Sequence, residues 1–266
     1  MACQAVRMSK LPFKQDIPFQ KLEVEPTYRL LSQSIIAQIL DGTLKHGDPI
    51  PTEATLCAQF GVNRSSVREG IRLLEESGML RRANAKRLVV SRPTAGEMAV
   101  QMERGMRLHE VTFFELWETA MVLEPKTAAL AAVHLDAWDI EAVRLNLEAT
   151  EKALGNPAAL AAFDVQFHAL LANGVHNRVL LLTREPMARL FYPAFEAVLS
   201  RVPESGERLL KAHQAIFLAL QQGNAIDAAT WMEKHIKDFK RGFDLASLNI
   251  QSNEIEMKEL NISTTH

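Results

Sequence analysis

The sequence predicts a mainly α-helical chain built of two parts. Apolar residues recur at helical spacing through most of its 266 residues, and strand-like patterns are confined to one short stretch around residues 79–90. Because 47% of the residues are apolar and 23% charged, both parts can bury a core. We expect an N-terminal part of three helices and a hairpin, followed by an all-α bundle of six or seven helices.

The N-terminal part is predicted to run in the order helix, helix, helix, hairpin. Apolar residues at helical spacing place the first helix at residues 27–40. Thr52 and Asn63 are typical N-cap residues for the second and third helices. Residues 79–82 and 87–90 then read as two short strands around a turn.

Composition predicts where the parts begin and end. Residues 1–24 lack sustained periodicity and are expected to form an arm, and the polar residues 246–266 a tail. Between them we expect one domain at 25–92, a linker with Pro and Gly at 93–97, and a helical domain at 98–245. Helix breaks inside the second domain are expected near 135–136, 155–157, 173–174, 203–206 and 223–224.

Charge is distributed unevenly between the two parts. Residues 1–95 hold 14 Lys and Arg against 9 Asp and Glu, a balance of +5, whereas the remainder holds 16 against 23, a balance of −7. Chance variation of a mixed surface is one explanation. The other is that the basic front part meets a polyanionic partner.

The cysteines and the hydropathy of the sequence indicate in which cellular compartment the protein resides. Cys3 and Cys57 lie far apart, so no structural disulfide is expected, which fits a reducing environment. No apolar run approaches the ~20 residues that span a bilayer. Residues 1–15 also lack the apolar core of a signal peptide. We therefore expect a cytoplasmic protein that does not contact membranes.

The second and third helices meet across residues 60–63 in the manner of a helix-turn-helix. Gly61 permits the tight corner, so the third helix can enter a major groove of DNA. A single arginine at the start of this helix could simply belong to a solvent-exposed face. Several polar residues at the start of a helix that follows such a turn indicate instead that the helix contacts DNA bases. The DNA-contacting candidates are Asn63, Arg64, Ser65, Ser66, Arg68 and, from the hairpin, Lys86.

The segment 47–74 resembles the GntR family of bacterial regulators. It reads GDPIPTE, then LCAQFGVNRSSVREGIRLL from Leu56 onward. The resemblance implies a winged helix-turn-helix and double-stranded operator DNA as the partner. It also implies DNA contacts by Asn63, Arg64, Ser65 and Arg68, with wing residues near Lys86 assisting.

Two departures from that family pattern concern the phosphate contacts and the wing. Ala54 stands where many members carry an arginine. The wing tip has Ala83 and Ala85 in place of the usual glycines. Neither departure concerns the residues at the start of the third helix.

Four residues of the helical part could meet at one cation. Asp164 and His168 are four residues apart and share a helix face, while His213 and His235 sit within later helices. In a bundle these side chains could present one carboxylate and three imidazoles, the ligand set of a zinc-like site. From spacing alone, the alternative is that each histidine is a hydrogen-bonded core residue.

The helical part also resembles the FCD ligand-binding domain of FadR-type GntR regulators. The resemblance rests on Asp164-Val-Gln-Phe-His168, on the surroundings of His213 and His235, and on Leu123-Glu124-Pro125. Metal-containing members carry one Asp and three His at these places. This implies a divalent metal here, zinc in the first place and nickel or a similar ion in the second, and a small carboxylic acid as effector.

One position departs from the FCD pattern. Ala120 replaces an arginine that is common in the opening helix and often helps to bind the effector carboxylate. We therefore expect the metal and other polar groups to anchor the effector. The candidates for this role are Asn177, Arg184 and Arg189.

Three functions are compatible with these patterns. We expect a homodimeric transcriptional regulator, because paired DNA-binding heads gain affinity through effective concentration and an effector can shift that affinity by linkage. The alternative is a metal-responsive regulator with a structural or sensory metal and no organic effector. A metalloenzyme is the third, because such a ligand set leaves coordination positions open. We expect no enzyme, since no carboxylate is an obvious general base and an enzyme needs no helix-turn-helix.

Overall fold

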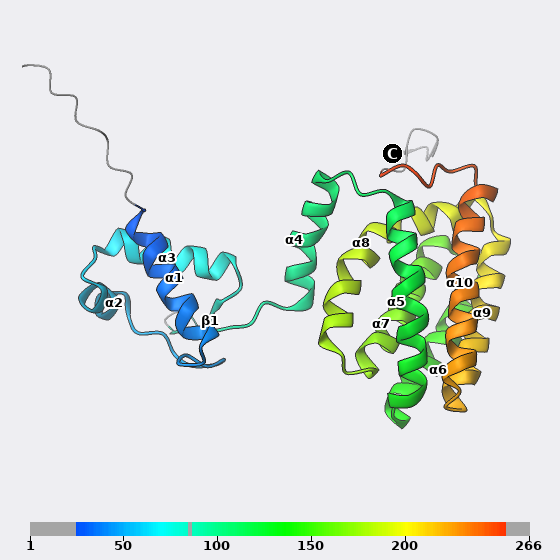
Figure 1. The fold of residues 1–266 in the computed structure, drawn as a ribbon, viewed down its shortest axis with the longest axis horizontal. Coiled ribbons are helices and arrows are strands. Elements are labelled where there is room, and N and C mark those ends of the chain that lie inside the picture. Colours follow the sequence, from blue (N-terminus) through cyan, green and yellow to red (C-terminus); the bar gives the residue numbers. More distant parts are fainter. Residues whose placement is uncertain (1–24, 85–86, 254–266) are drawn as a thin grey trace, which may run out of the picture. The chain divides into compact units, whose positions relative to one another are not determined.

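The computed structural model describes residues 25–84 and 87–253, which form ten helices and one two-stranded sheet (Figure 1). This confirms the mainly α fold class. The chain divides into two compact units, one ending at Arg92 and the other beginning at Pro93. The expected arm, the DNA-contact candidate Lys86 and the tail from residue 254 lie outside the described residues.

The described part of the first unit, residues 25–84 and 87–92, consists of three helices and an antiparallel hairpin. Its elements are α1 (Thr27–Leu40), α2 (Glu53–Phe60), α3 (Arg64–Glu76), β1 (Leu80–Asn84) and β2 (Arg87–Val90). In the hairpin, Leu80 pairs with Val90 and Arg82 with Leu88. A core of aliphatic side chains from all of these elements holds the unit together, including Leu31, Ile35, Leu56, Val67, Ile71, Leu74, Leu80 and Val90.

Local capping fixes the starts of α2 and α3. The Thr52 side chain accepts a hydrogen bond from the N–H of Thr55, and the Asn63 side chain accepts one from the N–H of Ser66. Between the helices, Gly61 adopts a left-handed conformation with φ of 66°, which glycine tolerates best. Both caps match those that the sequence predicts.

Between residues 93 and 253, which the structure describes, the second unit contains seven helices, within the predicted six or seven. They are α4 (Ala95–Leu108), α5 (Phe113–His134), α6 (Ala137–Lys152), α7 (Pro157–Gly174), α8 (Arg178–Arg201), α9 (Glu204–Gln221) and α10 (Ala225–Leu245). Helix α10 packs mainly against α5 and α9, and α8 packs against α7 and α4. The long helices run side by side around a common core (Figure 1).

The linker predicted at 93–97 is shorter in the structure, because α4 begins at Ala95. The Thr94 side chain accepts a hydrogen bond from the N–H of Glu97, whose carboxylate accepts one from the N–H of Thr94. This capping box satisfies two helix N–H groups that would otherwise lack partners. It outweighs the helix-breaking tendency of Gly96.

Residues 246–253, which follow α10, pack onto the second unit, although the sequence predicts a polar tail there. The carbonyl oxygens of Ile250 and Ser252 accept hydrogen bonds from the N–H groups of Phe114 and Phe113, at 2.8 and 3.0 Å. These bonds satisfy N–H groups at the start of α5, which have no partner within the helix. Among the described residues, no helix is long and apolar enough to cross a membrane.

Gly70 marks the closest approach of α3 to α1. A Cβ at this position would lie 2.7 Å from the Leu31 Cδ2 atom and 3.0 Å from the carbonyl oxygen of Tyr28. The side-chain atom can move, whereas the backbone oxygen is fixed by the helix. The absence of a side chain at Gly70 therefore sets the spacing of the two helices.

We predict that Gly70→Ala lowers the free energy of unfolding of the first unit by about 1–3 kcal/mol, because the added methyl group overpacks the contact with α1. The matched control is Gly105→Ala in α4, where a Cβ would meet nothing within 4 Å. That change should stabilise its unit by about 0.4–1 kcal/mol. Chemical denaturation of both variants measures the two effects, and equal shifts would contradict the packing argument.

Candidate functional site

The start of α3 presents the side chains that the sequence singles out for DNA. The Asn63 Oδ1 atom accepts hydrogen bonds from the Ser65 hydroxyl at 2.7 Å and from the N–H of Ser66 at 2.9 Å. Asn63 and Ser65 therefore brace the first turn. Arg64 is exposed in that same turn.

Arg68 lies one turn further along α3 and is oriented by α2. Its Nε atom donates to the Glu53 carboxylate at 2.9 Å, while 67% of the arginine side chain remains exposed. This bond uses Nε and leaves the terminal nitrogens for a two-point contact of the kind that guanine accepts. Glu53 is fifteen residues away from Arg68, so no local pattern in the sequence predicts this pairing.

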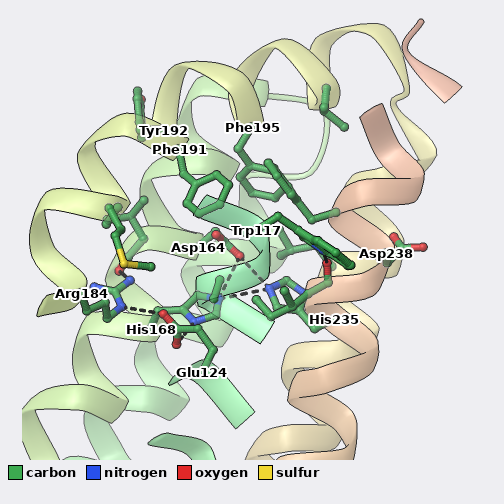
Figure 2. A pocket seen from close by; sticks show the side chains of 18 of the residues that line it. Trp117, Glu124, Asp164, His168, Arg184, Phe191, Tyr192, Phe195, His235 and Asp238 are labelled. Atoms are coloured by element: carbon green, nitrogen blue, oxygen red, sulfur yellow. Dashed lines mark hydrogen bonds and ion pairs between the residues drawn. The ribbon is translucent and has the colours of Figure 1, made fainter. Parts of the chain in front are cut away.

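The structure brings Asp164, His168, His213 and His235 together inside the second unit. Figure 2 shows three of them, Asp164, His168 and His235. The first two lie on α7, and the histidines at 213 and 235 on α9 and α10. One donor atom from each of the four lies within 4.8 Å of the others, a spread close to twice a metal–nitrogen bond of roughly 2.1 Å. The four side chains can thus surround a single ion.

Several atoms of this cluster are buried without a hydrogen-bond partner. They are Asp164 Oδ1 and both ring nitrogens of His213, although Asp164 Oδ1 lies 3.3 Å from His213 Nε2. The Nε2 atoms of His168 and His235 face one another at 3.1 Å. Buried polar atoms without partners are unfavourable, and a cation between them would pair with Asp164 Oδ1 and with one ring nitrogen of each histidine. The donor set therefore fits a metal ion.

The electrostatics of the cluster keep ligand lone pairs available. Burial lowers the pKa of the fully buried His213 to about 3, so its imidazole is neutral at physiological pH. Burial opposes charge on Asp164, but the imidazoles of His213 and His235 outweigh that effect and hold the pKa of its carboxyl well below the ordinary value. The Phe167 ring stacks on His213 with a centroid distance of 3.7 Å and orients it.

A second layer of buried charges positions His168. Its Nδ1 atom lies 2.8 Å from Glu124 Oε2, and Glu124 Oε1 accepts a hydrogen bond from Arg184 Nε at 3.1 Å. A proton on Nδ1, donated to Glu124, leaves the Nε2 lone pair facing the cluster. Arg184 also donates through Nη2 to the carbonyl of Val165.

Glu124 is a functional residue that the sequence analysis did not assign to the site. Burial raises the pKa of its carboxyl, but His168 and Arg184 outweigh burial and leave this pKa below the ordinary value. The available signal was a carboxylate within the largely apolar stretch 120–132, because such a residue is seldom buried without a partner.

A pocket opens next to the cluster. Asp164, His168 and His235 line it, and so does Arg184 from α8. Arg184 is buried, and its Nη1 atom has no hydrogen-bond partner. Much of the remaining wall is aromatic (Figure 2). The polar end of the pocket, formed by these residues and Glu124, is called its floor below. The rest of the pocket wall is mainly apolar.

Two of the three effector candidates do not reach this pocket. Asn177 caps α8, accepting hydrogen bonds from the N–H groups of Val179 and Leu180. Arg189 is exposed, and its Nη1 atom lies 3.8 Å from a carboxylate oxygen of Glu103 of α4. For Arg189 the helical repeat is the reason, because the pocket-lining positions of α8 follow Arg184 at intervals of three and four residues, out of phase with position 189.

Family comparisons assign both units. Residues 27–90 match the model described as bacterial regulatory proteins, gntR family, and residues 115–238 match the FCD domain. The chain belongs to the GntR family. It is a transcriptional regulator with a GntR DNA-binding domain followed by an FCD domain.

Curated relatives of this GntR regulator agree with the family. The Glc operon transcriptional activator of Escherichia coli strain K12 is 25% identical over 229 residues, covering 83% of this chain and 90% of the relative. The Uxu operon regulator of Haemophilus influenzae is 29% identical over 221 residues, covering 82% of each chain. These relatives are regulators and not enzymes, which confirms the expectation that the chain is no enzyme.

A solved structure supports the fold. The Streptococcus agalactiae GntR structure superimposes with a TM-score of 0.58 at 22% identity, covering 80% of this chain and 99% of that one. At this identity the likeness concerns the fold alone.

We predict that Glu124→Gln lowers the pKa of His168 in chelator-treated protein. In the wild type, burial would lower this pKa, but the Glu124 and Asp164 carboxylates outweigh burial and raise it above the ordinary 6.5. Protonated His168 thus stabilises the fold below the unfolded pKa, and this contribution is lost as the pH rises through the folded value. Glu124→Gln should remove part of it.

An NMR titration of the imidazole signals measures this pKa. Glu118→Gln is the matched control, since Glu118 is an exposed residue on the same helix. It should leave the pKa of His168 unchanged. An unchanged pKa in Glu124→Gln would show that the contact between the two side chains is not formed in solution.

Proposed function

We propose that this regulator reads operator DNA with α3 and adjusts its operator affinity to a small organic acid, which is held at a divalent metal in the FCD domain. The observation that carries the proposal is the convergence of four donor atoms on one buried point beside a pocket. Binding at such a site shifts operator affinity only if the acid prefers one arrangement of the protein.

On the DNA side, the proposed base contacts are made by Arg64 and Arg68. Both are exposed at the start of α3, and Glu53 holds the second in place. Asn63, Ser65 and Ser66 contribute to the same helix start, whose N–H groups favour a phosphate. Lys86 is proposed to clamp the DNA backbone from the wing.

On the metal side, the proposed ligands are Asp164, His168, His213 and His235. Their nitrogen-rich set suits zinc, nickel or a similar ion better than magnesium or calcium. A 2+ ion on one carboxylate and neutral imidazoles would supply a net positive centre that attracts an anion. Arg184 stands beside it and offers a buried donor without a partner. A carboxylate is the anion that both groups would bind.

A second function is compatible with the same cluster. In it, the metal would be structural or sensory, and no organic acid would be involved. The pocket argues against this alternative, because a metal that only stabilises the bundle needs no cavity lined by its ligands. Removal of the metal with no acid able to alter operator binding would favour it.

We further propose that the regulator acts as a homodimer on an inverted-repeat operator. A single head with a few base contacts binds weakly, and a two-fold pair gains affinity through effective concentration. Operator DNA in bacteria lies in the cytoplasm, which is the compartment proposed here.

We predict that Arg64→Ala and Arg68→Ala each reduce discrimination between operator and random DNA. A lost two-point base contact should cost about 1–3 kcal/mol. Electrophoretic mobility shifts measure this on an operator selected by the wild-type protein from a random pool. The matched control is Arg72→Ala, because Arg72 on the same helix is paired with Glu69 and Glu76. Wild-type discrimination in both test variants would place the recognition surface elsewhere.

We predict that the purified protein carries one divalent ion per chain and that Asp164→Asn strongly lowers this content. The amide keeps the shape of the side chain but loses the charge that a cation needs. His213→Ala should act likewise, and His134→Ala, which removes an exposed histidine of α5, should not. Elemental analysis measures the ion, and operator binding should persist in all three variants. Equal metal contents in the four proteins would exclude this cluster as the site.

A further inference from the structure

We infer that the effector of this regulator is a monocarboxylate with a flat aromatic body. The inference rests on the proposed function, since it names the class of acid that the pocket would accept. It rests on a contrast within the cavity. The floor is charged and can hold one anion, whereas the walls are formed largely by aromatic side chains (Figure 2).

The walls gather an unusual share of the aromatic residues of the chain. The protein has 12 Phe, 3 Trp and 2 Tyr in 266 residues. Five of them line this one pocket, from α5, α8 and α10: Trp117, Phe191, Tyr192, Phe195 and Phe239. Flat ligands pack well against such rings, in stacked or edge-to-face arrangements.

Three of these aromatic side chains, Phe191, Phe195 and Phe239, pack on one another. The Phe239 ring meets Phe191 edge-on with a centroid distance of 5.1 Å, and it meets Phe195 at 5.5 Å. In Figure 2, Phe191 and Phe195 lie on one side of the cavity, across from His168 and Glu124. A ligand anchored at the floor would therefore place its body against these rings.

The polar atoms of these walls are already engaged within the protein. The indole N–H of Trp117 donates to the carbonyl of Ile236 at 2.9 Å, and the Tyr192 hydroxyl donates to the carbonyl of Ala158 at 3.3 Å. The pocket-lining Asp238 and Ser205 both accept from Arg208. A ligand rich in hydroxyl groups would lose water there and gain few hydrogen bonds in return.

The charge of the floor limits the ligand to one carboxylate. The carboxylates of Asp164 and Glu124 and the guanidinium of Arg184 sum to −1, and a divalent ion would raise the sum to +1. One carboxylate neutralises that charge, whereas a second would be buried without a partner. Ala120 also lines the pocket, so this position adds no cation.

The test uses the full-length, metal-loaded protein and isothermal titration calorimetry. The probes are benzoate and phenylacetate, with gluconate and lactate as hydroxy acids, phthalate as a dicarboxylate and benzyl alcohol as a ring without a carboxylate. We expect at least one of the two aromatic monocarboxylates to bind at least ten-fold more tightly than every other probe. Tighter binding of gluconate, lactate or phthalate would overturn the aromatic class and leave the proposed acid site intact.

Variants separate the inference from the proposed function. Phe191→Leu keeps an apolar wall without the ring and should weaken binding of the aromatic acid about three- to ten-fold. Phe217→Leu is the matched control, because Phe217 packs against the core away from the pocket, and it should have no effect. Asp164→Asn should abolish binding of every acid. If none of the acids binds the metal-loaded wild type, both the acid effector and its aromatic class are rejected. If an acid binds as tightly to Phe191→Leu as to the wild type, only the aromatic class is rejected.

Discussion

Asp164 imposes the main constraint on the helical unit, because a carboxylate at this depth must be surrounded by groups that stabilise its charge. Three imidazoles from α7, α9 and α10 supply that environment. These histidines are themselves buried. Three helices must therefore meet at one point with little freedom to slide. The apolar packing around the point follows from this arrangement, as the stacking of Phe167 on His213 shows.

The Glu124–Arg184 pair extends this constraint to two more helices. Through His168, the pair ties α5 and α8 to the cluster on α7. Breaking one side of a buried ion pair is costly, because the other charge remains without its partner. A structural change at the cluster would therefore shift α8, the helix that supplies most of the aromatic wall.

Local signals were sufficient to predict much of the first unit. Thr52, Gly61 and Asn63 act within a few residues of their own positions, so the sequence shows their roles directly. The start of α4 was missed although Thr94 and Glu97 form an equally local signal. Pro93 and Gly96 favour a linker at the same positions, so two local signals conflict there.

The residues of the site are predicted mainly by the family resemblance and less by local sequence patterns. The family motif pointed to the four residues of the cluster, whereas spacing alone left core histidines as an alternative. Glu124 and Arg184 are sixty residues apart, and no helical period relates them. Residue type alone makes Asn177 and Arg189 candidates, but Asn177 caps the start of α8 and the phase of α8 directs Arg189 away from the pocket. Which polar side chains meet in a bundle depends on the packing of helices that are distant in sequence.

The pairing of Arg68 with Glu53 has a consequence for the search along the chromosome. Random DNA attracts a protein through the sum of its positive charges, and each neutralised phosphate releases counterions. An arginine already neutralised by a neighbouring carboxylate adds little to that attraction. On the proposed docking, its terminal nitrogens contribute mainly where a guanine edge meets them. The carboxylate of Glu53 would thereby shorten the time that the protein spends on the wrong sequence.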